Sequence, residues 1–530
     1  MSVLRAGSDA VVIGAGHNGL VAANLLADAG WSVTVLEATA QPGGAVRSGN
    51  LTAPGYLSDL FSAFYPLGYA SPVLEKLDLD LDWVHAPEVF AHLLPDGRAA
   101  MVSRDLATTM ASMEQFAPGD GDRWKAVYEQ WTSISGPLIE SLFTPFPPVR
   151  PGLALLRRLR TAGALRLARL AMLPARELGA QWFRGEGASV AMAGCALHTD
   201  LSPEQAGSGI YGWLLAMLGQ QIGWPVPRGG AQRLTDALVR RLEARGGRMA
   251  YGVPVERVLI ARGRAVGVRT ADGHDHRARR AVLADVPAPA LFLDLVGDRW
   301  LPPRLVEDLD HFRWDGATVK IDWAVGSKIP WSDPAVGRAG TVHLGTDLDG
   351  LTRYAGHLAL DEVPAQPFLL LGQMTTADPT RSPAGTESAW CYTHLPRRAS
   401  WSAGEIDEHV ARMEATVERH APGFGRSVVA RNVMSPADFE QANPSLAGGS
   451  IGGGTSAAFQ QLFLRPIPGL GRPDTPVDRL YLASSSAHPG GGVHGGPGSN
   501  AARAALARDR GVGGRAYRAA VSATNRAIYR

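Results

Sequence analysis

A glycine motif close to the N-terminus constrains the fold more than any other feature of the sequence. Residues 14–19 read GAGHNG and match the pattern G-x-G-x-x-G. The apolar run from Asp9 to Ile13 before them predicts a buried parallel strand. In such a motif Gly14 makes the tight turn, Gly16 lets the backbone approach a pyrophosphate, and Gly19 lets the following helix pack closely on the strand.

The residues after this motif complete the pattern of a dinucleotide-binding unit. Leu20 to Ala29 predict a helix that ends at Gly30, and Ser32 to Leu36 predict a second strand. Glu37 ends that strand, about 20 residues after the motif, where an acidic side chain bonds ribose hydroxyls. The alternative is an ordinary glycine-rich turn between strand and helix, with Glu37 solvated at the strand end.

A second glycine pair follows the acidic residue. Residues 41–47 read QPGGAVR, so Gly43 and Gly44 again remove side chains, and Arg47 places a cation close by. A fixed guanidinium beside a glycine loop can face a phosphate. A simple NAD site does not require this loop, and its presence favours a larger dinucleotide.

The C-terminal part carries the second glycine-rich signature. A strand is predicted over Arg479 to Ala483, a loop over residues 484–500 and a helix from Ala501 to Ala507. The loop reads SSSAHPGGGVHGGPGSN and contains His488. So many glycines expose backbone amides at the start of a helix, where an anion or a carbonyl can bind.

These motifs resemble those of a known family of flavoproteins. The set Glu37, Gly43, Gly44 and Arg47 is similar to the extended FAD motif of the glutathione-reductase-like flavoproteins, in their amine oxidase and phytoene desaturase branch. The C-terminal pattern LYLxxxxxHPGGGVxGxPGxNAAR resembles that of the phytoene-desaturase-related FAD-dependent oxidoreductases. Its triple glycine favours the subgroup formed by the bacterial relatives of an animal mitochondrial oxidoreductase. The resemblance covers both ends and the middle of the chain.

The resemblance implies FAD as the cofactor and names further site residues. The strand that begins at Val255 would run beside the adenine, where a backbone amide can bond the ring. His488 would lie near the isoalloxazine and orient it or relay a proton, or else cap the loop before Pro489. Gly491, Gly492 and Val493 would contact the cofactor. His494 could face the cavity, and no metal site is expected.

The same resemblance gives the expected fold class and domains. With 530 residues the chain is too long for one core. We expect an α/β fold with a discontinuous, glutathione-reductase-like Rossmann FAD domain and a mixed α+β substrate domain. The FAD domain is assigned residues 1–75, 226–290 and 436–515. The substrate domain is assigned 76–225 and 291–435, and residues 516–530 are assigned to a C-terminal tail.

Composition excludes several classes of partner. A net charge of +2 gives no reason to expect nucleic acid. Cys195 and Cys391 form no redox pair near the glycine motif, which excludes a disulfide reductase of the usual design and favours a cytoplasmic protein. No signal peptide and no apolar run of membrane-spanning length are found. The oligomeric state is left open.

Residues 151–176 form a basic, leucine-rich segment that contains no acidic residue. Such a helix can lie on an anionic membrane surface, which would make the protein peripheral to the membrane. The alternative is a helix whose leucines pack inward while its arginines stay in water.

Three other segments carry open alternatives. The aromatic residues between Leu51 and Ala70 either pack between domains or line the substrate cavity. Lys320, in the strand pattern GATVKIDWAV, is expected to reach solvent, although flavin amine oxidases place a lysine near the flavin N5. The loop Gly448 to Gly454 is either flexible or allows close approach.

The predicted function is an FAD-dependent oxidoreductase of the dehydrogenase or desaturase type. Hydride would pass from a C–H bond of an apolar, lipid- or isoprenoid-like small molecule to flavin N5. No second G-x-G-x-x-G appears in a strand-to-helix context, so a dedicated NADPH domain is not expected and oxygen or a quinone would reoxidise the flavin. The alternatives are a flavin amine oxidase and a redox-neutral flavin isomerase or partner-binding subunit.

Overall fold

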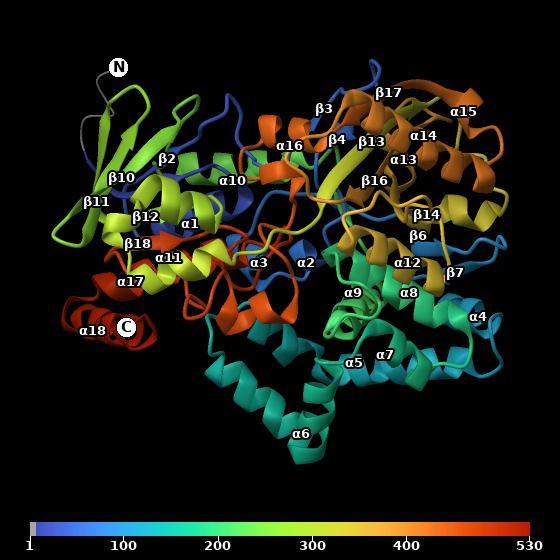
Figure 1. The fold of residues 1–530 in the computed structure, drawn as a ribbon, viewed down its shortest axis with the longest axis horizontal. Helices are drawn as coiled ribbons and strands as arrows, with labels where there is room; N and C mark the ends of the chain where they lie inside the picture. Colours follow the sequence, from blue (N-terminus) through green and yellow to red (C-terminus); the bar gives the residue numbers. More distant parts are fainter. Residues whose placement is uncertain (1–6, 530) are drawn as a thin grey trace.

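The computed structural model describes residues 7–529. Two β-sheets lie side by side along the longest axis, and a group of helices packs below the second sheet (Figure 1). The first sheet contains the N-terminal strand and the strand of the C-terminal signature, so opposite ends of the chain meet in one layer.

The first sheet has seven strands and a parallel centre. Its parallel part has the order β9-β2-β1-β12-β18, and β11 and β10 extend β12 as an antiparallel meander. Every residue of β2 is buried, as expected for a strand covered on both faces. The strand bounds are β1 Ser8–Ile13, β2 Val33–Leu36, β9 Arg248–Ala250, β10 Val255–Ala261, β11 Arg264–Thr270, β12 Asp275–Ala284 and β18 Leu480–Leu482.

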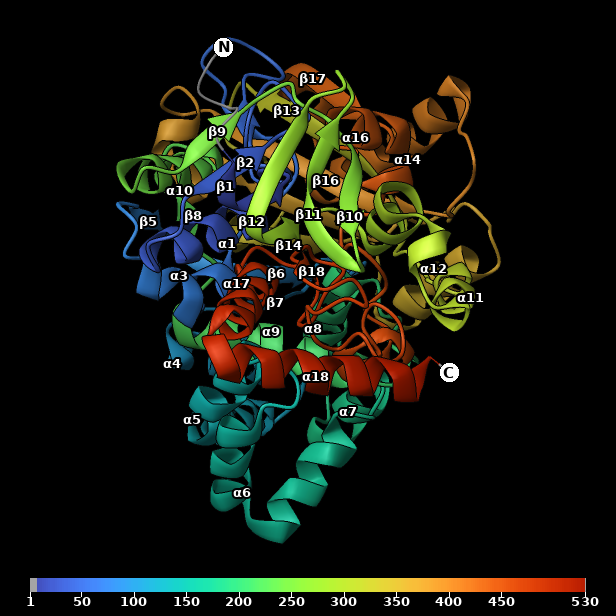
Figure 2. The same ribbon diagram turned by 90° about the vertical axis from the view of Figure 1, so that its left-hand side faces the viewer.

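Helices cover this sheet and join its two glycine-rich segments. Helix α1 (His17–Asp28) packs between α17 (Gly496–Asp509) and α10 (Gln232–Ala244). The approach of α1 and α17 is so close that a Cβ on Gly498 would lie 2.0 Å from the carbonyl oxygen of Asn18. Helix α18 (Gly511–Ile528) follows α17 and runs across the lower side of this part of the molecule (Figure 2).

The second sheet also has seven strands, in the order β17-β13-β16-β15-β14-β6-β7. All nine residues of the central strand β13 are buried. Helix α14 (Ala403–His420) packs on one face of this sheet, and α8 (Glu186–Ala196) and α12 (Leu348–Ala359) pack on the other. The strand bounds are β6 Glu88–Leu93, β7 Ala99–Val102, β13 Ala317–Val325, β14 Ala339–Leu344, β15 Leu369–Gln373, β16 Glu387–Leu395 and β17 Val428–Met434.

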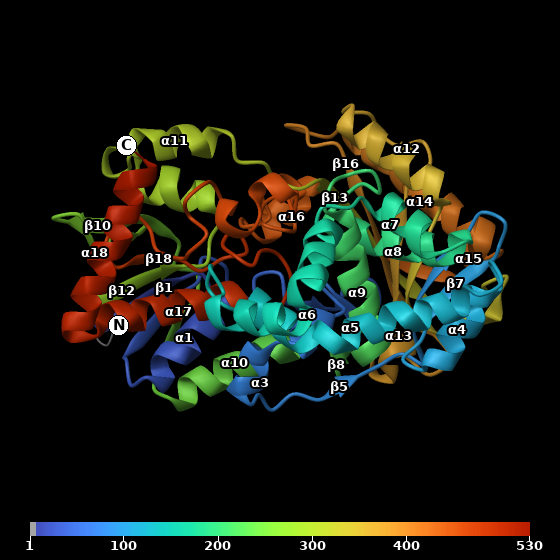
Figure 3. The ribbon, with the colours of Figure 1, turned by 90° about the horizontal axis from the view of Figure 1, so that it is seen from below.

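The helices from α4 to α9 form the lower part of the molecule. Helices α8 and α9 cross at Gly212, where a Cβ would lie 2.3 Å from the carbonyl oxygen of Met192. Helix α6 projects from the body with a break at Arg160, whose φ is 54° (Figures 1 and 3). The remaining bounds in this group are α4 Leu106–Glu114, α5 Asp120–Leu142, α6 Val149–Leu170, α7 Ala175–Trp182 and α9 Ser208–Ile222.

A buried ion-pair cluster ties distant segments together beside the second sheet. Arg381 donates to Asp59 at 3.0 Å and to Asp378 at 2.9 Å, and all three side chains are fully buried. Short elements connect the larger ones: β3 Ser48–Gly49, β4 Ser58–Asp59, β5 Trp83–Val84, β8 Val226–Pro227, α2 Pro66–Tyr69, α3 Pro72–Leu77, α11 Pro303–Asp310, α13 Met374–Ala377, α15 Phe424–Ser427 and α16 Pro436–Ala442.

The strands and the helix expected between Asp9 and Leu36 are confirmed. The strands of the first sheet fall within the segments assigned to the FAD domain, and those of the second within the segments assigned to the substrate domain; the exact domain bounds stay a prediction. Most of the segment assigned to a tail forms helix α18. None of the helices in residues 7–529 has the length and apolar character needed to cross a membrane.

Candidate cofactor and substrate cavity

A cavity of about 1090 Å³ runs between the two sheets. Pockets for one drug-sized ligand measure roughly 300–1,000 Å³, so this cavity lies at or above the upper end of that range. Ten of the twelve predicted site residues line it: Gly14, Gly16, Glu37, Gly44, Arg47, Val255, His488, Gly491, Gly492 and Val493. The other two, Gly19 and Gly43, lie immediately behind this lining.

The first glycine motif forms one end of the cavity. Gly14 has a φ of 87°, and a Cβ on Gly16 would lie 2.5 Å from Oδ2 of Asp285. A Cβ on Gly19 would lie 2.3 Å from the carbonyl oxygen of Gly14, so Gly19 serves the packing of α1 on the strand. The N–H of Gly19 donates to Asp285 Oδ2 at 2.8 Å. Side chains are therefore excluded from this turn by the backbone and by one carboxylate.

Glu37 is fixed at the end of β2 by hydrogen bonds that leave it facing the cavity. Its Oε2 accepts from the N–H of Ala15 at 2.7 Å, and its Oε1 accepts from the N–H and hydroxyl of Thr39 at 2.8 and 2.7 Å. Each carboxylate oxygen offers about two lone-pair sites, so Oε2 keeps one for a further donor such as a ribose hydroxyl.

The second glycine pair packs directly on the first motif. The N–H of Gly43 donates to the carbonyl of Ala15 at 2.8 Å, and a Cβ on Gly44 would lie 3.1 Å from the Cα of Gly16. Arg47 donates to the carbonyls of Gly44 and Ala442 at 3.1 and 2.7 Å. Its guanidinium is buried and contacts no carboxylate in residues 7–529. The arginine thus brings a positive charge without a direct ion pair to the cavity wall, where Glu37 is the carboxylate that acts on it from a distance.

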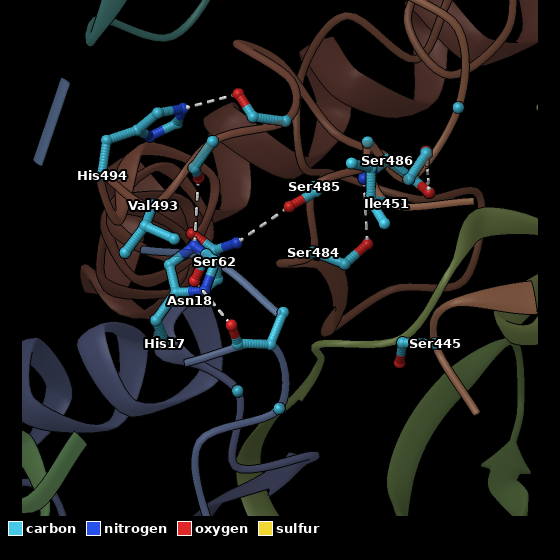
Figure 4. Close-up of a pocket in the computed structure, with 18 of the residues that line it drawn as sticks. His17, Asn18, Ser62, Ser445, Ile451, Ser484, Ser485, Ser486, Val493 and His494 are labelled. Carbon is cyan, nitrogen blue, oxygen red and sulfur yellow. Dashed lines mark hydrogen bonds between the residues drawn. The ribbon is translucent and has the colours of Figure 1, made fainter. Parts of the chain in front are cut away.

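The C-terminal glycine loop meets the start of α1 (Figure 4). His17 Nε2 lies 3.2 Å from the carbonyl oxygen of Gly492, and Asn18 Nδ2 donates to the hydroxyl of Ser485 at 3.4 Å. The Oδ1 atom of Asn18 is buried and has no partner in the described part of the chain. A donor from a bound ligand would satisfy it.

His488 lies in the cavity wall with its ring buried beside the backbone carbonyls of Leu142 and Thr144. Which of its two predicted roles it has stays a prediction. Burial lowers the pKa of His488 to about 4, so the ring is neutral at pH 7. His494 differs, because its Nδ1 accepts from Gly496 N–H at 3.1 Å and its Nε2 lies 3.3 Å from the carbonyl oxygen of Gly491.

The structure corrects the expectation that Lys320 reaches solvent. Lys320 is 1 % exposed and lines the cavity, because β13 is covered on both faces. Its Nζ donates to Asp322 Oδ1 at 2.5 Å and to the carbonyl of Asp59 at 2.9 Å. Burial raises the pKa of Asp322 to about 6. The sequence signal that could have indicated such a pair is a lysine and an aspartate two residues apart, on one face of a strand.

The loop that includes Gly448 to Gly454 is held rather than free. Asp315 accepts hydrogen bonds from the hydroxyl of Ser450 and from the N–H groups of Ile451, Gly452 and Gly454. On the other side Arg465 donates to the carbonyls of Gly452, Thr455 and Ser485. Close approach is the role that fits, because a Cβ on Gly491 would lie 2.8 Å from the carbonyl oxygen of Gly452.

The wall away from the glycine loops is made of side chains. Three of the aromatic residues between Leu51 and Ala70 line the cavity, which supports the second of their two predicted roles. Together with residues from α5, α9 and β16 they give a largely apolar surface: Phe61, Phe64, Tyr65, Leu138, Leu142, Ile210, Leu214, Leu215, Trp224, Trp390 and Tyr392. Neither Cys195 nor Cys391 is in the lining.

A polar group on this wall was missed by the sequence analysis. His198 and Asp200 line the cavity, from the turn that follows α8. His198 Nε2 lies 2.8 Å from Nε2 of His343, and Asp200 Oδ1 lies 2.6 Å from Nε2 of His394. His198 and Asp200 share one turn, but their partners His343 and His394 lie on β14 and β16, far away in sequence, so no local pattern marks the group.

Comparisons with known proteins agree with this geometry. Residues 19–355 match the family described as flavin containing amine oxidoreductase. The chain is 30% identical over 544 residues to rat pyridine nucleotide-disulfide oxidoreductase domain-containing protein 2, covering 93% of this chain and 92% of the rat protein. It is 25% identical to the neurosporene-forming phytoene desaturase of Rhodobacter capsulatus, covering 91% of each. A crystal structure of an oxidoreductase from Methanosarcina mazei has a similar fold, with a TM-score of 0.63 at 18% identity, covering 94% of this chain and 99% of that one.

Proposed function

Because this chain belongs to the flavin-containing amine oxidoreductase family and is an FAD-dependent oxidoreductase of the desaturase or oxidase type, we propose that it dehydrogenates an apolar, isoprenoid- or lipid-like substrate. The observation that carries the proposal is the cavity itself. Glycine loops line one end, aromatic and aliphatic side chains line the other, and both ends belong to one continuous cavity. An apolar molecule bound there would face a cofactor bound at the glycine end.

The residues at the glycine end fit FAD. Glu37 and the strand start at Val255 would hold the adenosine, and the turn at Gly14 and Gly16 would hold the pyrophosphate at the N-terminus of α1. This end of the cavity is open to a cofactor because its glycines carry no Cβ. The Oδ1 atom of Asn18 has no partner among the described residues and could accept a hydrogen bond from the cofactor. Bound FAD supplies hydride acceptance at N5.

The C-terminal loop and Arg47 complete the cradle. Gly491, Gly492 and Val493 line the cavity beside the N-terminus of α17, whose dipole favours negative charge. The buried guanidinium of Arg47, which makes no direct ion pair among the described residues, adds to this field. His488, which is neutral at pH 7, would orient the flavin through a ring nitrogen. These residues position the cofactor, and the apolar wall excludes water from the reacting atoms.

The flavin amine oxidase is the second candidate. Trp390 and Tyr392 stack at a centroid distance of 5.8 Å on the cavity wall, and such rings suit an amine as well as a hydrocarbon. The apolar residues of α5 and α9 extend well beyond this pair and favour the larger, apolar substrate.

An anaerobic titration of the FAD-loaded protein tests the proposal. The panel contains an unsaturated cyclic terpene, a long polyisoprenoid hydrocarbon and an aliphatic diamine. We expect a hydrocarbon to bleach the flavin absorbance. Bleaching by the diamine alone would establish the oxidase, and double-bond isomers formed only from pre-reduced protein would establish the isomerase. No bleaching by any hydrocarbon contradicts the proposed reaction.

The proposal extends to contact with an anionic membrane through α6. Only Pro151 and Leu170 of this helix are buried. Leu153, Leu156 and Leu165 are 48 %, 53 % and 67 % exposed. Six arginines of α6 form no ion pair in the described part of the chain: Arg150, Arg157, Arg158, Arg160, Arg166 and Arg169. Exposed leucines beside unpaired arginines suit a surface of anionic lipid.

The position of the cavity supports this contact. Residues on both sides of α6 line it, including Pro148 before the helix and Met172 after it. Met172 is 61 % exposed, and the nearby lining residue Leu462 is 49 % exposed. A lipid-phase substrate could enter between them without crossing water, and a membrane quinone is then the acceptor that fits, with oxygen as the alternative.

Vesicle flotation tests the membrane contact. The protein is mixed with vesicles of phosphatidylglycerol and phosphatidylcholine, and with pure phosphatidylcholine. We expect binding only to the anionic vesicles, and its loss in a variant with Leu153→Ser, Leu156→Ser and Leu165→Ser. Leu360→Ser, on the exposed end of α12, is the matched control and should float like wild type. Equal flotation of the triple variant and wild type contradicts the contact.

A further inference from the structure

A carboxylate faces the cavity at its largely apolar substrate end. Asp200 ends the turn that follows α8, with a φ of 61°, and its side chain is 18 % exposed and lines the cavity. Apolar residues of the same lining include Ile210, Leu214 and Trp224. A charge beside such residues is costly unless it is paired and hydrogen-bonded. The hydrogen bonds that this carboxylate makes, and those it leaves unmade, therefore restrict what can bind next to it.

Two groups of the protein hold the carboxylate in place. Its Oδ1 lies 2.6 Å from Nε2 of His394, and its Oδ2 accepts from the N–H of Gly316 at 2.9 Å. The Asp200 carboxylate has no other hydrogen bond or ion pair within residues 7–529. Each carboxylate oxygen offers about two lone-pair sites, so one site on each oxygen is free for a further donor.

His394 makes the site electrically neutral. Its ring is buried, and the hydroxyl of Thr318 lies 3.4 Å from its Nδ1. Burial by itself lowers the pKa of His394, but the charge of Asp200 and the hydrogen bond to it raise that pKa above its usual value. Burial opposes ionisation of Asp200, and His394 nevertheless lowers its pKa. Both shifts favour the charged forms, so the pair adds no net charge to the wall.

Strand β16 places a second polar group on the same wall. Trp390, Tyr392 and His394 alternate along the strand, so their side chains lie on one face of the sheet. Tyr392 lines the cavity, and the centroid of its ring lies 5.5 Å from that of His394. Its hydroxyl makes no hydrogen bond in the described part of the chain. Burial and then Asp200 raise the pKa of Tyr392 well above its usual value, so the phenol keeps its proton and can donate.

A free acceptor and a free donor on one wall fit a hydroxyl group. A hydroxyl both donates and accepts, so it can donate to Asp200 and accept from Tyr392. An ammonium group only donates, and it would bring an uncompensated charge to a pair that is already neutral. A pure hydrocarbon would leave the carboxylate without a donor and shielded from water.

We propose that Asp200 and Tyr392 form a subsite for a hydroxyl group, and that the substrate is therefore an apolar, isoprenoid- or lipid-like alcohol. This assignment rests on the proposed dehydrogenation and names the polar end of its substrate. The hydroxyl would be held at the turn after α8, and the apolar remainder would lie along Ile210 and Leu214 of α9. Asp200 and Tyr392 are then specificity-determining residues, whereas His394 is a positioning residue because it acts through Asp200.

Binding to a protein that cannot turn over tests the subsite apart from the reaction. The FAD-loaded protein is reduced with dithionite under nitrogen, so that no hydride can pass to the flavin. Quenching of tryptophan fluorescence measures affinity, since Trp224 and Trp390 line the cavity. The probes are farnesane, hexahydrofarnesol and hexahydrofarnesylamine: a saturated isoprenoid hydrocarbon, its primary alcohol and its primary amine. Because an alcohol loses more hydration than a hydrocarbon, the readout is the ratio of alcohol affinity to hydrocarbon affinity in each variant.

Asp200→Asn should lower this ratio about tenfold or more, because it removes the charged acceptor. Asparagine keeps the size of the side chain and tolerates the left-handed backbone of this position. Tyr392→Phe should lower the ratio about threefold, because it removes a neutral donor. Tyr211→Phe is the matched control and should leave the ratio unchanged, since Tyr211 lines the cavity from α9 with a hydroxyl that also makes no hydrogen bond among the described residues.

A ratio that is the same in wild type, Asp200→Asn and Tyr392→Phe overturns the subsite and means that the carboxylate holds water only. Tighter binding of the amine than of the alcohol, lost in Asp200→Asn, also overturns it, because the subsite would then belong to an ammonium group. If Asp200→Asn does not fold, Tyr392→Phe carries the test, since no part of the described chain depends on that hydroxyl. The proposed function fails separately, when no apolar molecule bleaches oxidised flavin, whereas this ratio is measured without any reaction.

Discussion

The two ends of the cavity are built in opposite ways. The cofactor end is made of backbone, since its turns exclude side chains at positions such as Gly16 and Gly491. The substrate end is made of side chains, and its polar members are held in pairs, as in Lys320 with Asp322 and Asp200 with His394. A backbone cradle can bind a cofactor common to many enzymes, whereas a wall of side chains can change with the substrate.

The largest effect is expected where a substrate-end pair is broken. Lys320→Met leaves the carboxylate of Asp322 buried without its cation, so the free energy of unfolding should fall by about 3–5 kcal/mol. Urea unfolding of the FAD-free protein measures it. The double variant with Asp322→Asn removes both charges and should recover much of the loss. If the single variant is as stable as wild type, the Lys320–Asp322 pair does not contribute to the stability of the substrate end.

At the cofactor end, by contrast, we expect a substitution to destabilise the protein because the new side chain clashes with the backbone. Gly19→Val places a Cβ 2.3 Å from the carbonyl oxygen of Gly14, which overpacks the turn. We expect a loss of about 3 kcal/mol in unfolding free energy and the loss of bound FAD. The ratio of visible to ultraviolet absorbance of the purified protein reports the cofactor. A fully yellow variant would show that the turn tolerates side chains.

Arg47 is the place where a side chain contributes to the cofactor end. Arg47→Met keeps most of the packing and removes the buried positive charge, so FAD affinity should fall by about 2 kcal/mol, or roughly 30-fold. Fluorescence titration with FAD measures this. Arg47→Lys is the control that keeps the charge and should bind more tightly than Arg47→Met. Equal affinities for the two variants would assign the effect to shape alone.

The smallest effect concerns Asp285, the carboxylate that lies against Gly14, Gly16 and Gly19. Burial raises the pKa of Asp285 to about 7, well above the 3.8 of a free aspartate. The folded state therefore binds the proton more tightly, so stability falls as pH rises through the folded pKa. Between pH 6 and pH 8 the free energy of unfolding should fall by about 1 kcal/mol from this group.

Asp285→Asn isolates this contribution. The variant should lose that part of the pH dependence, and urea midpoints at pH 6 and pH 8 compare it with wild type. Retention of the full slope by Asp285→Asn would mean that another group is responsible.

This contrast explains what the sequence could predict. The strand, turn and helix around Gly14 are contiguous in sequence, so the pattern alone predicted the cofactor end, although the contact that excludes a side chain at Gly16 comes from Asp285, far along the chain. The second signature around Gly491 is also contiguous in sequence, although the carbonyl oxygen that a Cβ there would meet belongs to Gly452. That the N-terminal and C-terminal signatures lie in one sheet could not be predicted in this way, because it depends on the pairing of β12 with both β1 and β18.

The substrate end has no such local code. Lys320 was expected in solvent because a strand lysine usually faces water, and only the cover on both faces of β13 reverses that expectation. His198, His343 and His394 come from a turn after α8 and from two strands, and nothing in their neighbouring residues links them. A sheet brings such residues together through register, which a single sequence does not reveal.

The most direct measurement is the FAD affinity and stoichiometry of wild type, Gly16→Val and Gly491→Val by isothermal titration. If both ends of the chain bind one cofactor, wild type takes up one non-covalent FAD per chain, and each single substitution abolishes binding. Retained tight binding in either variant, or a wild-type chain that takes up no FAD, would contradict the account.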